Sequence, residues 1–321
     1  MSGLILLLVC NLFWAAAPTA AKVLISEVGA PAAAWLKYAG AMAAFLLCLP
    51  LIRRAFPEPE SRPLRRISPR DLGILALIGL ATCTLSPLAQ MRGLTASTAV
   101  NNSILVCLEP LMTLVLAWLL LRDRIRNMDA LVILIAATGA LILSGLASRE
   151  SLADLPAALK AWSRGDLLLV FGLFCEACCS VLPRLLKEKH SGLRIYGVAS
   201  TVGLALLSLI LLPTYGFPRI GALSPRGWLA FFWLGPITAF SYVAWLHILQ
   251  RGTSLPAMVA TLYCQPVFGA LAGRFVLGEP LGSRQIIGGA LILGAVTWRM
   301  LHEGRASRAL EPVLPACEAA P

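Results

Sequence analysis

The chain alternates long apolar segments with short polar or basic connections. Ten apolar segments can be marked, and their approximate bounds are 4–25, 31–52, 71–91, 96–121, 128–146, 165–186, 195–213, 228–249, 255–277 and 284–301. About twenty apolar residues, at a rise of ~1.5 Å each, cross a hydrocarbon core of ~30 Å as an α-helix. The pattern therefore predicts an all-α polytopic membrane protein with ten transmembrane helices.

The order of these segments contains an approximate repeat. Glu109-Pro110 lies in the middle of segment 96–121, and Gln265-Pro266 lies in the middle of segment 255–277; in both copies an acidic residue follows thirteen positions after the proline. Residues 6–9 and 167–170 both read Leu-Leu-Leu-Val. These matches indicate two related halves of five spans each.

The domain division follows from this repeat. We expect a first half over residues 1–147, an outer connecting segment over 148–164, a second half over 165–302, and a disordered tail over 303–321. Residues 148–164 carry apolar side chains at helical spacing, which predicts a short helix on the outer membrane surface.

Basic residues in the connections set the predicted orientation. Of the 27 lysines and arginines, 17 fall on the side that also holds both termini and 7 fall on the other side. Lys22, Lys37 and Arg274 lie within spans. The positive-inside rule then places both termini in the cytoplasm of a multi-pass protein of the cytoplasmic (inner) membrane. With five spans per half, the second half enters the membrane from the opposite face, which is an inverted repeat.

Composition agrees with the pattern and excludes other classes. The chain is 58% hydrophobic and 13% charged, with a mean hydropathy of +0.80, which is incompatible with a soluble domain. The formal net charge of +11 lies between apolar spans, where it orients the protein and contacts anionic membrane lipid, so no nucleic-acid partner is expected.

Candidate enzyme and metal chemistry is weak. The sequence has no HExxH, Gly-x-Ser-x-Gly or P-loop motif, so no enzyme activity and no cofactor are expected. Cys175, Cys178 and Cys179 share one helical face, but no second ligand pair accompanies them. We interpret the cysteines within spans as small packing residues rather than a metal site.

Two carboxyl groups near the centres of spans are the main functional candidates. An ionised side chain at that depth costs ~2.5 kcal/mol or more, so Glu109 and Glu176 are expected to face the protein interior. Either can bind a cationic group or exchange a proton. The alternative is a glutamate that only ties helices together by hydrogen bonds.

Other polar residues within spans have a structural and a functional interpretation. Lys22, Lys37 and Arg274 lie near outer span ends, where long side chains can reach water, or they line the outer part of a pathway. Gln90 and His247 can face a cavity or join helices. Asn101 and Asn102 point about 100° apart on a helix, so at most one is expected in a given cavity.

Several short motifs, in this order and spacing, resemble the EamA-type branch of the drug/metabolite transporter superfamily. They are Trp14 with Lys22, Pro31 with Lys37, Glu109-Pro110, Arg122-Asp123, Pro266, Glu279-Pro280 and Gly288-Gly289. The chain departs from the family pattern at Ala15, Lys37, Arg122-Asp123 and Gln265, where the family often has glycine, arginine, Gly-Glu and an acid. The resemblance covers nearly the whole chain.

The resemblance implies a secondary transporter whose two inverted halves enclose a cavity open alternately to each side. We expect export of a small polar or amphipathic metabolite such as an amino acid, with or without proton exchange, by a monomer or homodimer. Substrate or proton binding is expected at Glu109, Glu176, Lys22, Lys37, Asn102, Gln265 and Trp14, and helix breaking or gating at Pro110, Pro266 and Arg274. The alternatives are a passive channel and a scaffold subunit that transports nothing.

Overall fold

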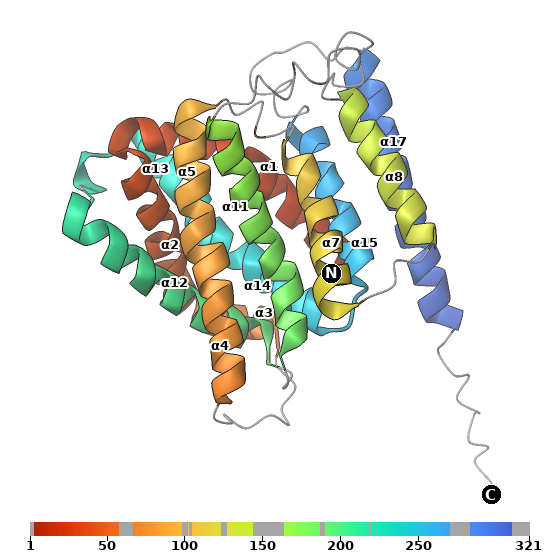
Figure 1. The fold of residues 1–321 in the computed structure, drawn as a ribbon, viewed down its shortest axis with the longest axis horizontal. Helices are drawn as coiled ribbons and strands as arrows, with labels where there is room; N and C mark the ends of the chain where they lie inside the picture. The colour runs from red at the N-terminus through yellow and green to blue at the C-terminus, as the bar shows by residue number, and fades with distance from the viewer. Residues whose placement is uncertain are drawn as a thin grey trace, which may run out of the picture.

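A computed structural model describes residues 3–57, 67–97, 102, 105–122, 127–143, 164–186, 190–218, 220–269 and 283–309 (Figure 1). All regular structure in these ranges is helical, and each of the ten predicted spans contains helix. The expectation of an all-α polytopic membrane protein is confirmed. Arg274 and residues 148–163, which include the predicted surface helix, lie outside the described ranges.

In the described ranges, nine elements come from the first half of the chain. They are α1 (Gly3–Val28), α2 (Ala30–Leu47), α3 (Leu49–Ala55), α4 (Pro69–Ile78), the π-helix η1 (Gly79–Leu85), α5 (Ser86–Ala96), the 3₁₀ turn η2 (Val106–Leu108), α7 (Glu109–Leu121) and α8 (Asn127–Leu143).

Nine further elements come from the described part of the second half. They are α11 (Arg164–Val181), the 3₁₀ turn η3 (Leu182–Leu185), α12 (Gly192–Tyr215), the 3₁₀ turn η4 (Ile220–Ala222), α13 (Pro225–Leu234), α14 (Pro236–Gln250), α15 (Leu255–Ala260), the 3₁₀ turn η5 (Thr261–Tyr263) and α17 (Ser283–Ala309).

Helix lengths in the described residues fit a bilayer. Six helices are long and apolar enough to cross it, and three shorter apolar helices occur at Glu109–Leu121, Ala130–Gly139 and Ile286–Trp298. Large apolar side chains such as Leu134, Leu209 and Leu229 are exposed on the outside of the bundle, as expected for a surface that faces lipid.

Helix ends follow local chemistry. Ser68 begins α4 and Ser224 begins α13, and each hydroxyl accepts a hydrogen bond from the backbone N–H three residues later. α17 continues to Ala309, past the predicted end at residue 301, because Gly304 costs only ~1 kcal/mol in a helix otherwise rich in alanine and arginine. Residues 303–309 of the predicted disordered tail are therefore helical.

The helices pack in pairs that correspond when the two halves are exchanged. α1 packs on α13 and α14, and its counterpart α11 packs on α5 and η1; α2 packs on α12, and α8 packs on α17. In Figure 1, α8 and α17 stand side by side at one edge of the bundle and run in opposite directions. Each pair combines one helix from each half, which is the packing expected of an inverted repeat.

Two close backbone contacts show the same correspondence. A Cβ added to Gly235 would lie 3.1 Å from the backbone of Gly40, and a Cβ added to Gly203 would lie 2.8 Å from the carbonyl oxygen of Gly79. Gly40 on α2 corresponds to Gly203 on α12, and Gly79 at the start of η1 corresponds to Gly235 between α13 and α14. Absence of a side chain lets these helices approach closely at both sites.

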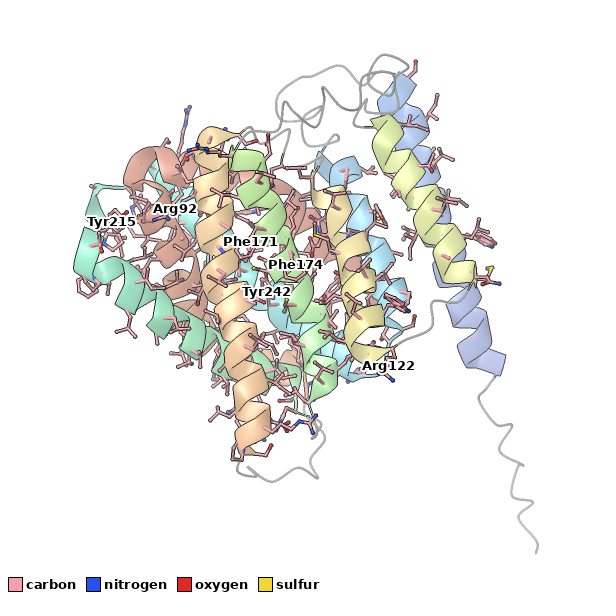
Figure 2. The ribbon with its side chains drawn as sticks, viewed as in Figure 1. Arg92, Arg122, Phe171, Phe174, Tyr215 and Tyr242 are labelled. Carbon is pink, nitrogen blue, oxygen red and sulfur yellow. The ribbon has the colours of Figure 1, made fainter. Side chains whose placement is uncertain are left out.

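The ends of the helices divide into two sides. In Figure 1, α4 and α8 begin, and α7, α11 and α17 end, at the lower side of the molecule. Figure 2 places Arg122 at this lower end of α7 and Arg92 toward the opposite end of α5. The two sides match the predicted inner and outer sides, although the assignment of the lower side to the cytoplasm remains a prediction.

Candidate functional site

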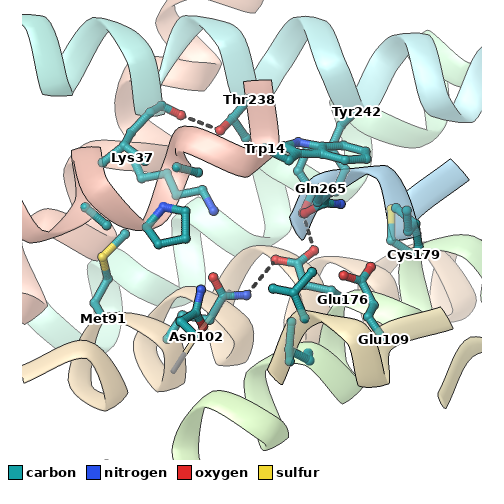
Figure 3. A pocket seen from close by; sticks show the side chains of 18 of the residues that line it. Trp14, Lys37, Met91, Asn102, Glu109, Glu176, Cys179, Thr238, Tyr242 and Gln265 are labelled. Atoms are coloured by element: carbon teal, nitrogen blue, oxygen red, sulfur yellow. Dashed lines mark hydrogen bonds between the residues drawn. The ribbon is translucent and has the colours of Figure 1, made fainter. Parts of the chain in front are cut away.

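A cavity of about 100 Å³ lies inside the bundle, between α1, α2, α5, α7, α11, α14 and the segment that follows η5. Six of the predicted binding residues line it, and Figure 3 shows them converging on one space: Trp14, Lys37, Asn102, Glu109, Glu176 and Gln265. One water molecule needs ~10–15 Å³ of the volume that a water-sized sphere can occupy. The cavity therefore holds on the order of seven waters or a small metabolite.

Glu176 on α11 is held in place by three hydrogen bonds. Ser86 Oγ donates to its Oε1 at 2.7 Å, Gln90 Nε2 donates to the same oxygen at 3.3 Å, and the Tyr242 hydroxyl donates to Oε2. Gln90 Nε2 also donates to Ser86 Oγ at 3.0 Å. An ionised carboxylate only accepts hydrogen bonds, so three donors match its needs and fix its position.

Glu109 has a different environment. It is the first residue of α7, directly after the 3₁₀ turn η2, and its carboxyl lines the cavity near Glu176. Within the described part of the chain, its side chain makes no hydrogen bond or ion pair. It is therefore the carboxyl that is available to a solute.

Lys37 supplies a cation to the same cavity. The side chain is 7% exposed, so it does not extend along the protein surface to water. Its Nζ lies 5.5 Å from the centre of the Tyr38 ring, a cation–π contact, and it forms no ion pair with any described residue. An ammonium in this position calls for an anionic partner, which a solute can provide.

Lys22 and the two prolines lie outside the cavity lining. Lys22 Nζ donates instead to the carbonyl oxygen of Ser97 at 2.8 Å. Pro110 occupies the first turn of α7, and Pro266 lies in helical residues after η5. Both prolines follow a 3₁₀ turn, which agrees with the irregular helices expected at these positions.

A buried amide chain joins the cavity to α1. Gln265 Nε2 donates to Asn11 Oδ1 at 3.1 Å, and Asn11 Nδ2 donates to Thr261 Oγ1 at 2.9 Å. Asn11 is fully buried. Sequence reasoning missed Asn11, although a lone amide in the middle of an apolar span was a usable signal.

Aromatic rings form one wall of the cavity. The Trp14 ring lies 5.8 Å from the Tyr242 ring and 5.5 Å from the Trp245 ring, centre to centre. Trp245 Nε1 donates to Ser180 Oγ at 3.0 Å. Sequence reasoning missed Tyr242 and Trp245, because aromatic residues are common in membrane spans and nothing in their spacing distinguishes these two.

The remaining candidates separate into cavity and packing residues. Gln90 and Cys179 line the cavity, whereas His247 packs its ring 5.1 Å from that of Phe56. In the described part of the chain, no group of three or more histidine, cysteine or acidic side chains is placed to hold a metal ion. Asn102 lines the cavity and is buried, while Asn101 lies outside the described residues.

A polar, charged cavity inside an all-helical membrane bundle is an arrangement found in membrane transporters. The chain belongs to the EamA-like transporter family, whose model matches residues 1–145 and 163–300.

Relatives carry general names. An "Uncharacterized transporter" of Methanothermobacter thermautotrophicus is 30% identical over 241 residues, which is 72% of this chain and 65%, just under two thirds, of that relative. "Uncharacterized transporter YyaM" of Bacillus subtilis is 26% identical over 301 residues, covering 91% of this chain and 92% of the relative. A solved crystal structure with 17% identity and a TM-score of 0.67 covers 94% of this chain and 99% of its own, so the fold is shared.

Proposed function

We propose that the protein is a secondary carrier that exports a small zwitterionic metabolite, such as an amino acid, by alternating access. The observation that carries this proposal is the presence of Lys37 and Glu109 in one cavity, each without an ionic partner among the described residues. A solute with both an ammonium and a carboxylate offers a partner to each.

The energetic argument rests on desolvation. Removing a charge from water costs several kcal/mol unless the charge is paired and hydrogen-bonded. A zwitterion that places its carboxylate at Lys37 and its ammonium at Glu109 satisfies both protein groups and both of its own charges. Trp14 and Trp245 offer apolar faces to the remainder of the solute.

Proton exchange is the proposed energy source. Glu109 is the better proton carrier of the two acids, because Glu176 is already held by three donors. A carboxyl that binds a proton and a substrate ammonium in alternation couples the two fluxes in opposite directions. This exchange would drive the substrate out of the cell against an inward proton gradient.

Counterflow into proteoliposomes tests the proposal. Pools of labelled amino acids and other metabolites are offered with and without an imposed pH gradient. Saturable exchange of zwitterions that the gradient accelerates supports the proposal. Saturable exchange indifferent to the gradient removes the proton step, and saturable exchange restricted to other solutes rejects the zwitterion.

A passive channel would behave differently. It would give non-saturating flux and conduct ions in planar bilayers. Either result, without counterflow of any pool, rejects the carrier.

A further inference from the structure

The cavity lies between two helix pairs, and each pair combines helices from both halves of the sequence. In the first pair, α1 packs against the span formed by α13 and α14. In the second pair, α11 packs against the span formed by α4, η1 and α5. Trp14 and Tyr242 line the cavity from the first pair, and Gln90 and Glu176 line it from the second. The cavity therefore lies between the two helix pairs and not between the two halves of the sequence.

The first pair is tied together along its length. Trp233 Nε1 of α13 donates to the carbonyl oxygen of Phe13 at 3.2 Å. At the far end of α1, Glu27 accepts a hydrogen bond from the backbone N–H of Ser224 at 2.9 Å. Gly227 leaves room for this carboxyl, because a Cβ at that position would lie 2.1 Å from Glu27 Oε2.

The second pair is equally tight. Gly93 on α5 and Gly165 on α11 approach so closely that a Cβ on Gly165 would lie 2.7 Å from the carbonyl oxygen of Gly93. Ser86 and Glu176 join the same helices at 2.7 Å near the middle. Close glycine contacts and these hydrogen bonds hold the helices of each pair together, which favours motion of each pair as a unit.

Two charged side chains connect one pair to the other at opposite ends. Lys22 Nζ of α1 donates to the carbonyl oxygen of Ser97, after α5, at 2.8 Å. Arg184 Nη2, after α11, donates to the carbonyl oxygen of Thr253, after α14, at 2.8 Å. The first bond lies where α5 ends and the second where α11 ends, and Figure 1 places these ends on opposite sides of the molecule.

These two bonds correspond when the halves are exchanged. Lys22 and Arg184 both lie toward the C-terminal end of the first span of their half, and Ser97 and Thr253 both follow the third span. Each joins a basic side chain to a backbone carbonyl, so either bond can break and leave an ammonium or guanidinium that reaches water near the membrane surface.

We propose that the Lys22–Ser97 and Arg184–Thr253 hydrogen bonds are the two gates of the cavity, and that the two helix pairs, rather than the two sequence halves, are the units that move. The inference rests on the proposed carrier function. Breaking the Lys22 bond separates the pairs at its end while the Arg184 bond holds the other end, and the reverse step opens the opposite side.

Reactivity of Cys179 measures gate opening without a substrate, because this cysteine lines the cavity. The other cysteines are replaced by alanine, and a membrane-impermeant thiol reagent is applied to right-side-out and inverted vesicles. Lys22→Met should raise the modification rate from the Lys22 side at least threefold and lower it from the other side. Arg184→Met should do the opposite.

Matched variants distinguish the effect of losing the gate hydrogen bond from the effect of losing a positive charge. Arg92 is exposed near the Lys22 end and Arg251 is exposed near the Arg184 end, so Arg92→Met and Arg251→Met should leave both rates unchanged. Lys22→Arg and Arg184→Lys keep a donor and should retain the wild-type rates. Rates that respond equally to all four methionine variants, or to none, overturn the gate assignment.

Spin-label distances identify the moving units. Ile5 and Leu229 are exposed on the first pair but belong to different halves, whereas Leu167 and Leu229 belong to one half but to different pairs. When the Lys22→Met variant is compared with the Arg184→Met variant, the distance between labels at positions 167 and 229 should differ. The distance between labels at positions 5 and 229 should be the same in both. The reverse result supports motion of the sequence halves and overturns the proposal.

The two levels of the hypothesis fail separately. Absence of counterflow in the wild-type protein rejects the carrier function, whatever the modification rates of Cys179 are. Counterflow that persists while Cys179 reactivity ignores both gate variants rejects only the gates.

Discussion

Glu109 and Glu176 place two carboxyl groups in one cavity, but the hydrogen-bonding surroundings of the two groups differ. Three donors hold Glu176, which positions it between α5, α11 and α14. Glu109 has a carboxyl without partners among the described residues and lines the same cavity as Lys37. At the scale of single residues, we therefore assign solute binding to the charged side chain without a described partner, rather than to every charged side chain in the cavity.

Glu109→Gln tests the proton and ammonium role. The amide keeps the size of the side chain but removes its charge and its proton exchange, so a charge-assisted hydrogen bond worth ~2 kcal/mol is lost and zwitterion binding should weaken about thirtyfold. Exchange should also lose its response to a pH gradient. Counterflow at several pH values measures both effects, and Glu109→Asp, which keeps the carboxyl, should retain the pH response.

Lys37→Met distinguishes a binding cation from a structural one. Replacing a buried, unpaired ammonium by an apolar side chain of similar length should leave the melting temperature unchanged or raise it, because the desolvation cost disappears. Counterflow of solutes with a carboxylate should fall at least tenfold. A lower melting temperature with normal transport would contradict the assignment.

Pairs of helices from opposite halves are the structural units at the scale of elements. Close contact requires glycine where backbones meet, as at Gly79 with Gly203 and at Gly40 with Gly235. The same requirement recurs at the outer edge, where a Cβ on Gly139 of α8 would lie 2.8 Å from the carbonyl oxygen of Gly288 on α17.

Gly203→Ala should destabilise the protein. The added Cβ would lie 2.2 Å from Cys83 Cβ and 2.8 Å from the carbonyl oxygen of Gly79, so α12 and η1 must separate at a cost of roughly 1–3 kcal/mol. Thermal unfolding in detergent measures this as a lower melting temperature. Gly73→Ala, on α4 with nothing within 4 Å of the new atom, is the matched control and should be neutral or slightly stabilising. Equal melting temperatures for the two variants would contradict the close-packing argument.

The whole molecule is arranged so that related features appear on opposite sides of the membrane. The Lys22–Ser97 and Arg184–Thr253 contacts correspond in this way, and so do the Glu27–Ser224 and Asp71–His190 contacts. An inverted repeat produces this relation, because exchanging the two halves turns each contact into its counterpart on the opposite side. Such symmetry is suited to opening each side in turn.

Topology is the testable property at this scale. A phosphatase that is active only outside the cytoplasm should be inactive when fused after residue 309 and active when inserted in the predicted outer segment 148–164. A fluorescent protein that matures only in the cytoplasm should give the opposite pattern. Phosphatase activity at the C-terminal fusion would reverse the predicted orientation.

Much of the fold was predictable, but the site was predictable only in part. Apolar length identified the spans, and the cost of a buried charge singled out Glu109 and Glu176. The sequence left two interpretations of Lys37 open, a side chain that reaches water near a span end and a binding residue, and the structure buries it in the cavity lining. Tyr242 and Trp245 gave no signal, because an aromatic ring is equally acceptable to lipid and to a cavity wall.

The sequence by itself determined the membrane class, the helical spans and their approximate repeat. These depend on hydrophobicity and helical rise, which are local properties. Tertiary structure alone decided which helix faces meet. In lipid the outer face of a helix is as apolar as its packed face, so periodicity does not distinguish them. Pairing across the halves, the cavity that joins Lys37 to Glu109, and the two end contacts therefore emerge only when the helices pack in three dimensions.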